Sequence, residues 1–269
     1  MKKALVYDWY TVYGGAERCN ESFTNIWPDL DHFALVDFLE STQRESILKG
    51  KPVTTSFIQK LPFAKKHYRK YLPFFPIAIE QFDLRKYDII LSSSSSVSKG
   101  VLTNHNQLHI SYVHSPPRYA WDLYQNYLDL ENLRKGIKGL VAKLILHYMR
   151  IWDIHTIERP DFYISNSKYV GSRIEKLYNK KSITIYPPVD VNRFKVVYER
   201  GDYFVTASRL VSYKKIDIIV RAFSETSHKL IVIGDGPDMK KLKSKASSNV
   251  TFAGYLERDE MIALTQRAK

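Results

Sequence analysis

Short apolar runs alternate with longer segments of helical period along most of this chain, and this alternation restricts the fold more than any other feature. Most of the runs are continuously apolar, which is typical of strands buried on both faces of a parallel sheet. The helical segments between them predict βαβ units and a doubly wound α/β architecture. The clearest expected strands are residues 4–7, 88–91, 108–113, 162–165, 183–186, 203–207, 230–233 and 250–252.

A proline-containing segment in the second half of the chain predicts a connection between two domains. It reads Tyr186-Pro187-Pro188-Val189-Asp190 and leads into a charged stretch. We therefore expect a first domain at residues 1–190, a linker at 191–202 and a second domain at 203–269. The second domain starts a fresh β-α pattern but reaches only three strands, which is half of a Rossmann-type domain. We expect it to be incomplete.

The formal net charge of +13 predicts a phosphate-bearing partner. Nucleic acid, an anionic membrane surface and a nucleotide-sugar all carry suitable charge, and the charge alone does not choose among them. A single cysteine excludes an intramolecular disulfide and fits a reducing cytosol. No stretch approaches the roughly 20 apolar residues of a membrane span, and the N-terminus lacks the apolar run of a signal peptide. We expect a cytoplasmic protein, soluble or peripheral to the membrane.

The first candidate site follows the first expected strand, which leads through Asp8 to the pair Gly14-Gly15 at the start of a helix. A glycine pair lets a ligand approach the backbone closely, and a helix N-terminus attracts anions. An ordinary loop-to-helix turn would look the same. There is no G-x-G-x-x-G fingerprint, so a nicotinamide or flavin cofactor is not expected.

The second candidate site is the segment from His114 to Asp122, directly after the expected strand 108–113. Ligands of open α/β sheets bind beyond the carboxyl ends of strands, where His114 could donate a hydrogen bond or carry a proton. Arg118 could pair with an anion. The alternative is a structural loop in which the histidine satisfies backbone groups.

The third candidate site follows the first strand of the second domain, where Arg209, Lys214 and Lys215 stand within seven residues. These cations could clamp a diphosphate and stabilise the negative charge that develops on a leaving group. A solvated basic turn is the alternative. Gly234, after the next strand, suggests close backbone approach or a tight turn.

Taken together, these segments resemble the retaining glycosyltransferases of family 4, and especially bacterial mannosyltransferases of O-antigen and exopolysaccharide assembly. The resemblance spans the whole chain, and its members stand in the same order and spacing. They are Asp8-Trp9 with Gly14-Gly15-Ala16-Glu17-Arg18, Tyr112-Val113-His114-Ser115-Pro116 with Arg118-Tyr119-Ala120-Trp121-Asp122, Ser165-Asn166-Ser167, Tyr186-Pro187-Pro188-Val189-Asp190, Arg209-Leu210 with Tyr213-Lys214, Gly234-Asp235-Gly236-Pro237 and Phe252-Ala253-Gly254-Tyr255.

The resemblance implies a GT-B fold of two Rossmann-like domains, a nucleotide-sugar donor (GDP-mannose favoured), transfer with retention and no metal or other cofactor. It assigns Arg209 and Lys214 to the donor diphosphate and His114 to the transferred sugar. The other implied contacts are Gly14, Gly15, Gly234, Gly254, Tyr255 and Leu256 on the donor side and Asp8 and Arg118 on the acceptor side.

One feature of the family is missing from the sequence. The family carries a glutamate pair, E-x7-E, beyond the third βα unit of the second domain, and the chain ends at Lys269 before that point. We therefore expect weak or no activity from these residues alone and full activity from the intact protein.

Two other functions compete with the transferase. A nucleotide-sugar epimerase would share the fold and the basic clamp without needing an acceptor. A nucleic-acid-binding protein would explain the charge, but the sequence contains no recognised RNA- or DNA-binding module, so we expect no nucleic-acid partner.

Two basic segments with apolar side chains are candidates for an anionic membrane surface, where a lipid-linked acceptor would reside. Residues 60–76 carry five cations in their first eleven positions and then an aromatic run. Residues 137–152 place apolar side chains on one helix face among cations, and here a core-facing helix is the slightly better interpretation. We expect the first segment to bind the membrane. The oligomeric state is left open.

Overall fold

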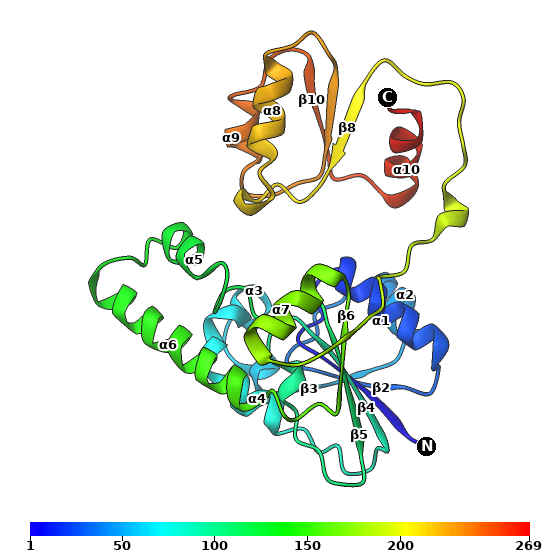
Figure 1. The fold of residues 1–269 in the computed structure, drawn as a ribbon. Helices are drawn as coiled ribbons and strands as arrows, with labels where there is room; N and C mark the ends of the chain where they lie inside the picture. Colours follow the sequence, from blue (N-terminus) through cyan, green and yellow to red (C-terminus); the bar gives the residue numbers. More distant parts are fainter. The chain divides into compact units, whose positions relative to one another are not determined.

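The structure, a computed structural model, divides the chain into two compact units, Met1–Pro188 and Val189–Lys269. It describes the backbone of residues 1–269 and every side chain except that of Leu130. Each unit is built on its own parallel sheet (Figure 1). The segment expected as a linker, residues 191–202, belongs to the second unit and begins with a short 3-10 helix, η4 (Val191–Arg193).

The first unit contains a seven-stranded sheet with the order β3-β2-β1-β4-β5-β6-β7, and all its strand pairs are parallel. The chain builds outward from β1 to β3 and then returns to place β4 on the other side of β1. The strand order therefore reverses between β1 and β4. The strands are β1 (Lys3–Tyr7), β2 (Asp31–Ala34), β3 (Val53–Thr55), β4 (Ile89–Ser94), β5 (Leu108–Val113), β6 (Phe162–Ser165) and β7 (Ile183–Thr184).

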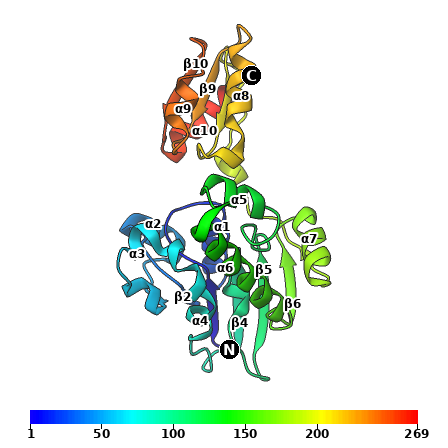
Figure 2. The same cartoon turned by 90° about the vertical axis from the view of Figure 1, so that its left-hand side faces the viewer.

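Helices cover both faces of this sheet (Figures 1 and 2). Apolar side chains of α1 and α2 pack on one face, and those of α4, α6 and α7 pack on the other. The α-helices are α1 (Gly15–Ile26), α2 (Ser41–Leu48), α3 (Ala64–His67), α4 (Phe75–Glu80), α5 (Tyr124–Leu130), α6 (Gly136–His155) and α7 (Lys168–Tyr178), and the 3-10 helices are η1 (Phe57–Lys60), η2 (Tyr68–Phe74) and η3 (Ser98–Gly100).

The second unit has a three-stranded parallel sheet in the order β10-β9-β8. Its core joins the strands to α8 and α9 through Leu210, Ile216, Val220, Leu230, Val232, Leu242 and Val250. Helix α10 (Arg258–Arg267) contacts β8, the edge strand of this sheet. Next to β8, Tyr203 Oη donates to the carbonyl of Leu264 at 2.9 Å. The elements are β8 (Phe204–Ala207), η5 (Ser212–Lys214), α8 (Ile216–Ser224), β9 (Leu230–Ile233), α9 (Met239–Lys243), β10 (Val250–Gly254) and α10 (Arg258–Arg267).

The predicted α/β class with parallel sheets is confirmed, and each of the eight expected strands is present within a few residues. Strands β2 and β3 were not among them. Both are short, at four and three residues, and β2 contains Asp31 and His32, which interrupt its apolar pattern. Asp31 is exposed, and its carboxylate accepts a hydrogen bond from Tyr87 Oη at 2.7 Å instead of packing in the core.

Candidate functional site

The candidate residues of the first unit follow strand ends on one edge of the seven-stranded sheet. Gly14 and Gly15 come after β1, while His114 and Arg118 come after β5; both strands are neighbours of β4. In open α/β sheets, ligands bind at the carboxyl ends of strands where the strand order reverses. That point lies between β1 and β4 here, so the topology brings these residues to the edge where a ligand is expected.

Asp8 follows β1 but is fully buried, so it does not contact an acceptor. Its Oδ1 accepts hydrogen bonds from the backbone N–H groups of Val97 and Ser98, each at 2.8 Å. Its Oδ2 accepts from the N–H and Oγ of Ser95 at 2.6 and 2.9 Å. Burial raises the pKa of Asp8, and the backbone donors oppose that shift. The expected acceptor role is wrong: the carboxylate holds the loop that follows β4.

The glycine pair begins α1 beside a buried carboxylate. The N–H of Gly14 donates to Glu17 Oε2 at 3.0 Å, and Tyr7 Oη donates to Oε1 at 2.8 Å. At Gly15 a Cβ would meet no atom within 4 Å, so packing inside the unit does not require a glycine there. The open space beside Gly15 is compatible with close approach of an anionic ligand to this helix N-terminus.

His114 is held firmly at the end of β5. Its N–H donates to the carbonyl of Ser94 at 2.8 Å, its Nε2 lies 2.8 Å from Ser93 Oγ, and its carbonyl accepts from Asn166 Nδ2 at 3.0 Å. Burial lowers the pKa of His114 to about 4. The ring is therefore neutral at pH 7. It can exchange a hydrogen bond with a ligand, but the expectation that it carries a proton near neutral pH is wrong.

The loop after His114 is fixed by contacts from α7. Arg173 Nη1 donates to Ser115 Oγ at 2.7 Å, and the same guanidinium pairs with the carboxylate of Asp122. The side chain of Arg118, in the middle of this loop, is exposed. A rigid loop with an exposed cation at its centre fits the predicted acceptor-side position of Arg118.

A buried ion pair that the sequence did not predict supports the same loop. Lys99 and Asp153 are each 1% exposed, and Lys99 Nζ lies 3.1 Å from Asp153 Oδ1. Asp153 also accepts from Trp121 Nε1 at 2.9 Å and from Tyr178 Oη at 3.0 and 3.1 Å. The network joins η3, α6, α7 and the end of the loop. Lys99 and Asp153 lie far apart in sequence, and no local pattern pairs them.

In the second unit, Arg209 and Lys214 are exposed cations on the loop that follows β8. Backbone hydrogen bonds fix this loop on both sides of Leu210, whose N–H donates to the Asp235 carbonyl at 2.9 Å and whose carbonyl accepts from Asp238 N–H at 3.1 Å. In the described part of the chain neither cation forms an ion pair. The charge of both is therefore available to a ligand.

Gly234 is required by the packing of this edge. Its φ is +126°, and a Cβ would lie 1.9 Å from the carbonyl oxygen of Ser208. Its N–H donates to the Gly254 carbonyl at 2.7 Å, which joins the ends of β9 and β10. Tyr255 follows with 73% of its surface exposed. The structure thus brings Arg209, Gly234 and Tyr255 to one edge of the small sheet.

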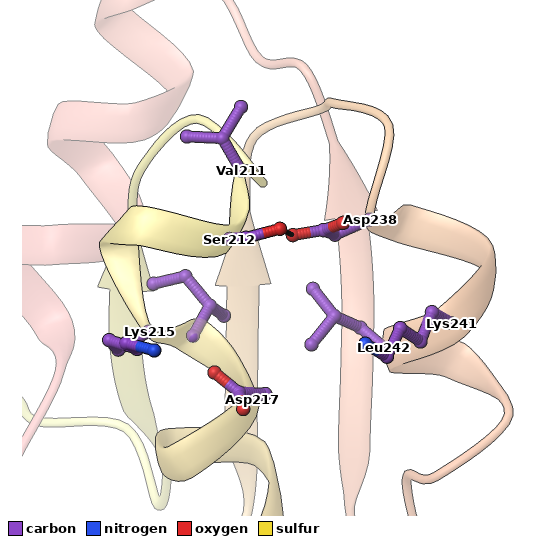
Figure 3. Close-up of a pocket in the computed structure, with 8 residues that line it drawn as sticks. Val211, Ser212, Lys215, Asp217, Asp238, Lys241 and Leu242 are labelled. Atoms are coloured by element: carbon purple, nitrogen blue, oxygen red, sulfur yellow. Dashed lines mark hydrogen bonds between the residues drawn. The ribbon is translucent and has the colours of Figure 1, made fainter. Parts of the chain in front are cut away.

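A small pocket lies beside this edge, between η5, α8 and α9 (Figure 3). It holds about 140 Å³, and cations (Lys215, Lys241) and carboxylates (Asp217, Asp238) both line it. Ser212 Oγ donates to Asp238 Oδ2 at 2.9 Å across its upper end. Neither Arg209 nor Lys214 lines it. Of the three cations of the third candidate site only Lys215 lines the pocket, and the Ser212–Asp238 bond anchors the segment that carries Lys214.

Comparison with known proteins decides the family. Residues 13–193 match the sequence model of Glycosyltransferase Family 4. The chain belongs to this family. It is a glycosyltransferase, and the matched segment covers more than half of it. None of the curated proteins matches the sequence.

Solved glycosyltransferase structures share the fold. HepE from Anabaena, solved with UDP and glucose, is 17% identical, with a TM-score of 0.61 over 99% of this chain and 72% of that one. Sucrose-phosphate synthase from Thermosynechococcus elongatus is 13% identical, with a TM-score of 0.63 over 100% and 74%. The galactosyltransferase WaaB of the lipopolysaccharide outer core is 16% identical, with a TM-score of 0.52 over 98% and 70%. This family 4 chain therefore has the GT-B fold of two Rossmann-like units, the second one small.

We expect the first unit of this family 4 chain to lose stability as the pH falls from about 6.5 to about 4. Burial lowers the pKa of His32, His109 and His114 to about 4, whereas histidine in an unfolded chain titrates near 6.5. Between these values the unfolded chain binds more protons, so the free energy of unfolding decreases on acidification by at most about 1.4 kcal/mol per pH unit for each histidine. Above pH 6.5 this effect is absent. Urea midpoints followed by tryptophan fluorescence at several pH values measure it.

His32 offers the sharpest variant for this prediction. Neither of its ring nitrogens has a hydrogen-bond partner in the described part of the chain, so His32→Leu removes one titrating group and no hydrogen bond. The pH dependence should become shallower by one proton. His105 is exposed, and His105→Gln should leave the dependence unchanged. A midpoint that stays constant from pH 7 to pH 4.5 would show that the buried histidines do not control stability.

Proposed function

We propose that the full-length protein transfers a hexose, with retention, from a nucleotide-sugar to a saccharide carried on a lipid. The observation that carries this proposal is the pair of exposed cations, Arg209 and Lys214, on a rigid loop at the carboxyl edge of the second unit. Cleavage of a sugar–diphosphate bond develops negative charge on the leaving group. Fixed cations at that position stabilise the charge.

The same pair supports a transferase that needs no metal. A diphosphate leaving group is stabilised by a divalent cation in some enzymes, and here Arg209 and Lys214 would supply the positive charge themselves. Gly254, Tyr255 and Leu256 would lie near the nucleotide base, and the close backbone approach at Gly234 shapes the same edge. Because the two cations would stabilise the diphosphate without a metal ion, turnover should persist in excess EDTA.

We propose mannose from GDP-mannose as the donor, because the motifs resemble those of bacterial mannosyltransferases. The HepE structure contains UDP and glucose, so UDP-sugars are the competing donors. The test presents GDP-mannose, UDP-glucose, UDP-galactose and UDP-N-acetylglucosamine, each labelled in the sugar, to the full-length protein together with membrane lipid extract. If only GDP-mannose transfers label to the lipid extract, the proposal is supported. If a UDP-sugar transfers the label instead, that UDP-sugar is the donor and GDP-mannose is not.

The acceptor is proposed to stand at the cytoplasmic face of the membrane, where the enzyme binds peripherally. The support is the strongly basic chain, with its net charge of +13, since anionic lipid attracts such a surface. No helix in the described part of the chain is long and apolar enough to cross a bilayer. If water-soluble saccharides accept the sugar as well as lipid extract does, the lipid-linked acceptor is not required.

His114→Ala should lower kcat by roughly 10- to 100-fold and leave the affinity for free nucleotide within about twofold. The neutral ring is fixed by Ser93 and would exchange a hydrogen bond with the transferred sugar. Removing one partner of such a bond leaves the other polar group unsatisfied, which costs about 1–3 kcal/mol. Calorimetric titration with the nucleoside diphosphate, beside steady-state kinetics, separates the two effects. The exposed His105→Ala is the control. A variant that loses nucleotide affinity but turns over normally at saturation would place His114 at the nucleotide.

A further inference from the structure

Helix α6 carries an apolar stripe that the first unit leaves uncovered. The side chains recur at intervals of three and four residues, so they lie on one helical face. Their exposed fractions run from 82% at Ile137 to 41% at Tyr148. The stripe consists of Ile137, Leu140, Val141, Leu144, Tyr148 and Ile151.

The unit buries a different face of the same helix. Leu146, Met149 and Trp152 are buried in the core, and Gly139 and Asp153 lie on the same side. Figure 1 shows that the last turns of α6 lie next to α4 and that its first turns extend away from the sheet beside α5. The sequence had favoured a stripe that faces the core. That interpretation holds for Met149 and Trp152. It is wrong for the exposed residues of the outer face, which are Ile137, Leu140, Val141, Leu144 and Tyr148.

The segment expected to bind the membrane, residues 60–76, turns most of its large apolar side chains into the core of the unit. Tyr68 and Phe75 are buried, and Leu61, Tyr71 and Leu72 pack against the same core. Phe63 and Phe74 are its exposed aromatic side chains, at 80% and 47%. The segment therefore offers fewer exposed large apolar side chains than the stripe on α6.

The exposed charges on α6 and at its start are positive, while Asp129, before the helix, pairs with Arg134. Lys135 and Lys138 are exposed near the first turn, and no acidic residue occurs from Arg134 to Arg150. Asp153 is the acidic residue of the helix, and it is buried in the ion pair with Lys99. An amphipathic helix of this composition lies in the plane of an anionic bilayer, with its apolar face in the acyl boundary and its cations at the headgroups.

A shallow hollow borders the stripe and is lined by both apolar and basic side chains. It has a volume of about 330 Å³, and its lining residues are Trp121, His147, Arg150, Ile151, Ile154 and His155. Because Trp121 ends the loop that begins at His114, the surface adjoins the loop expected to face the acceptor.

We propose that the outer face of α6 docks the enzyme on an anionic lipid bilayer. The proposal deepens the membrane association put forward as part of the proposed function and assigns it to α6 in place of residues 60–76. A second copy of the chain fits this face less well, because pairing two stripes would bring their basic flanks together. The bilayer supplies both the apolar interior and the opposite charge that the face needs.

A polarity-sensitive fluorophore attached to the stripe tests the docking directly. The one native cysteine, Cys19, is 1% exposed, so a cysteine introduced by Leu140→Cys takes the label selectively. Vesicles of phosphatidylcholine with 30% phosphatidylglycerol are expected to shift its emission to the blue, and higher salt should reverse the shift because screening shortens the attraction. The matched control is Ser46→Cys on α2, which is also exposed and should not respond. A response from position 46 that equals that from position 140, or none from either, overturns the proposal.

Vesicle flotation of Leu140→Gln/Leu144→Gln provides the second arm. Both side chains are exposed at 59–60%, so the fold should be preserved, while the partition coefficient should drop by at least about tenfold. The variant Lys65→Gln/Lys66→Gln/Arg69→Gln/Lys70→Gln should lose less than the leucine variant. If the leucine variant floats as the wild type does, α6 is not the docking surface. If light scattering instead shows a wild-type dimer that the leucine variant converts to monomer, the face is an interface between copies. Nucleotide binding is measured separately by calorimetry, so failure of docking leaves the transferase assignment intact.

Discussion

Arg209→Ala and Lys214→Ala in the full-length protein should each lower kcat by about 10² to 10³, the loss typical of one preorganised charge-stabilising contact. Both side chains are exposed and take no part in the core of the second unit, so the thermal midpoint should not move. Steady-state kinetics at saturating donor measure the effect. The double variant should lose less than the product of the two single losses, because residues that act on one charge are not additive.

The control for these variants is Lys241→Ala. Lys241 is an exposed cation of the same unit and lines the small pocket, which neither Arg209 nor Lys214 lines (Figure 3). Its loss removes the same net charge, so a general electrostatic effect on donor binding would appear equally in all three variants. If Arg209→Ala and Lys214→Ala both turn over within about threefold of the wild type at saturating donor, these residues do not stabilise the leaving diphosphate.

Lys99→Met should destabilise the first unit by about 3–5 kcal/mol, which is the usual cost of removing one partner from a buried ion pair. The change leaves the Asp153 carboxylate buried without its cation, although Tyr178 and Trp121 still donate to it. Urea unfolding followed by tryptophan fluorescence measures the loss. Burial lowers the pKa of Lys99, and the pairing with Asp153 opposes that shift.

Two further variants show whether the cost comes from the unpaired charge. Lys99→Met/Asp153→Asn removes both charges and should recover part of the stability. Arg85→Met breaks an exposed pair with Asp83 and should produce no measurable change, as is usual for surface pairs. If Lys99→Met is as harmless as Arg85→Met, the buried pair does not stabilise the unit, and Trp121 must be held by other contacts.

Features that depend on local pattern could be predicted from the sequence. The continuous apolar runs gave eight of the strands, and the position of His114 or Arg209 directly after a strand placed each at a carboxyl edge. Strand β3 could not be found in this way, because Val53–Thr55 is three residues long and has no periodicity to detect.

Features that depend on distant partners could not be predicted. The position of Asp8 after a strand suggests a ligand contact. The structure shows instead that backbone N–H groups of the loop from Ser95 to Ser98 donate to both of its carboxylate oxygens. The charge state of His114 depends on burial that no local pattern reveals. In α6 the period identified apolar side chains correctly, but it does not distinguish a face covered by the core, as at Met149, from one left open, as at Leu144.

The central claim is that the protein breaks a sugar–nucleotide bond and moves the sugar to another molecule. The most direct measurement uses a nucleotide-sugar labelled with ¹⁴C in the sugar and ³²P in the phosphate next to it, incubated with the full-length protein and membrane lipid extract. A transferase releases the nucleoside diphosphate and places the sugar in the lipid fraction in equal amounts, and Arg209→Ala suppresses both. If both labels stay on one molecule while the sugar changes its configuration, the enzyme is an epimerase and the proposed transfer to an acceptor is contradicted.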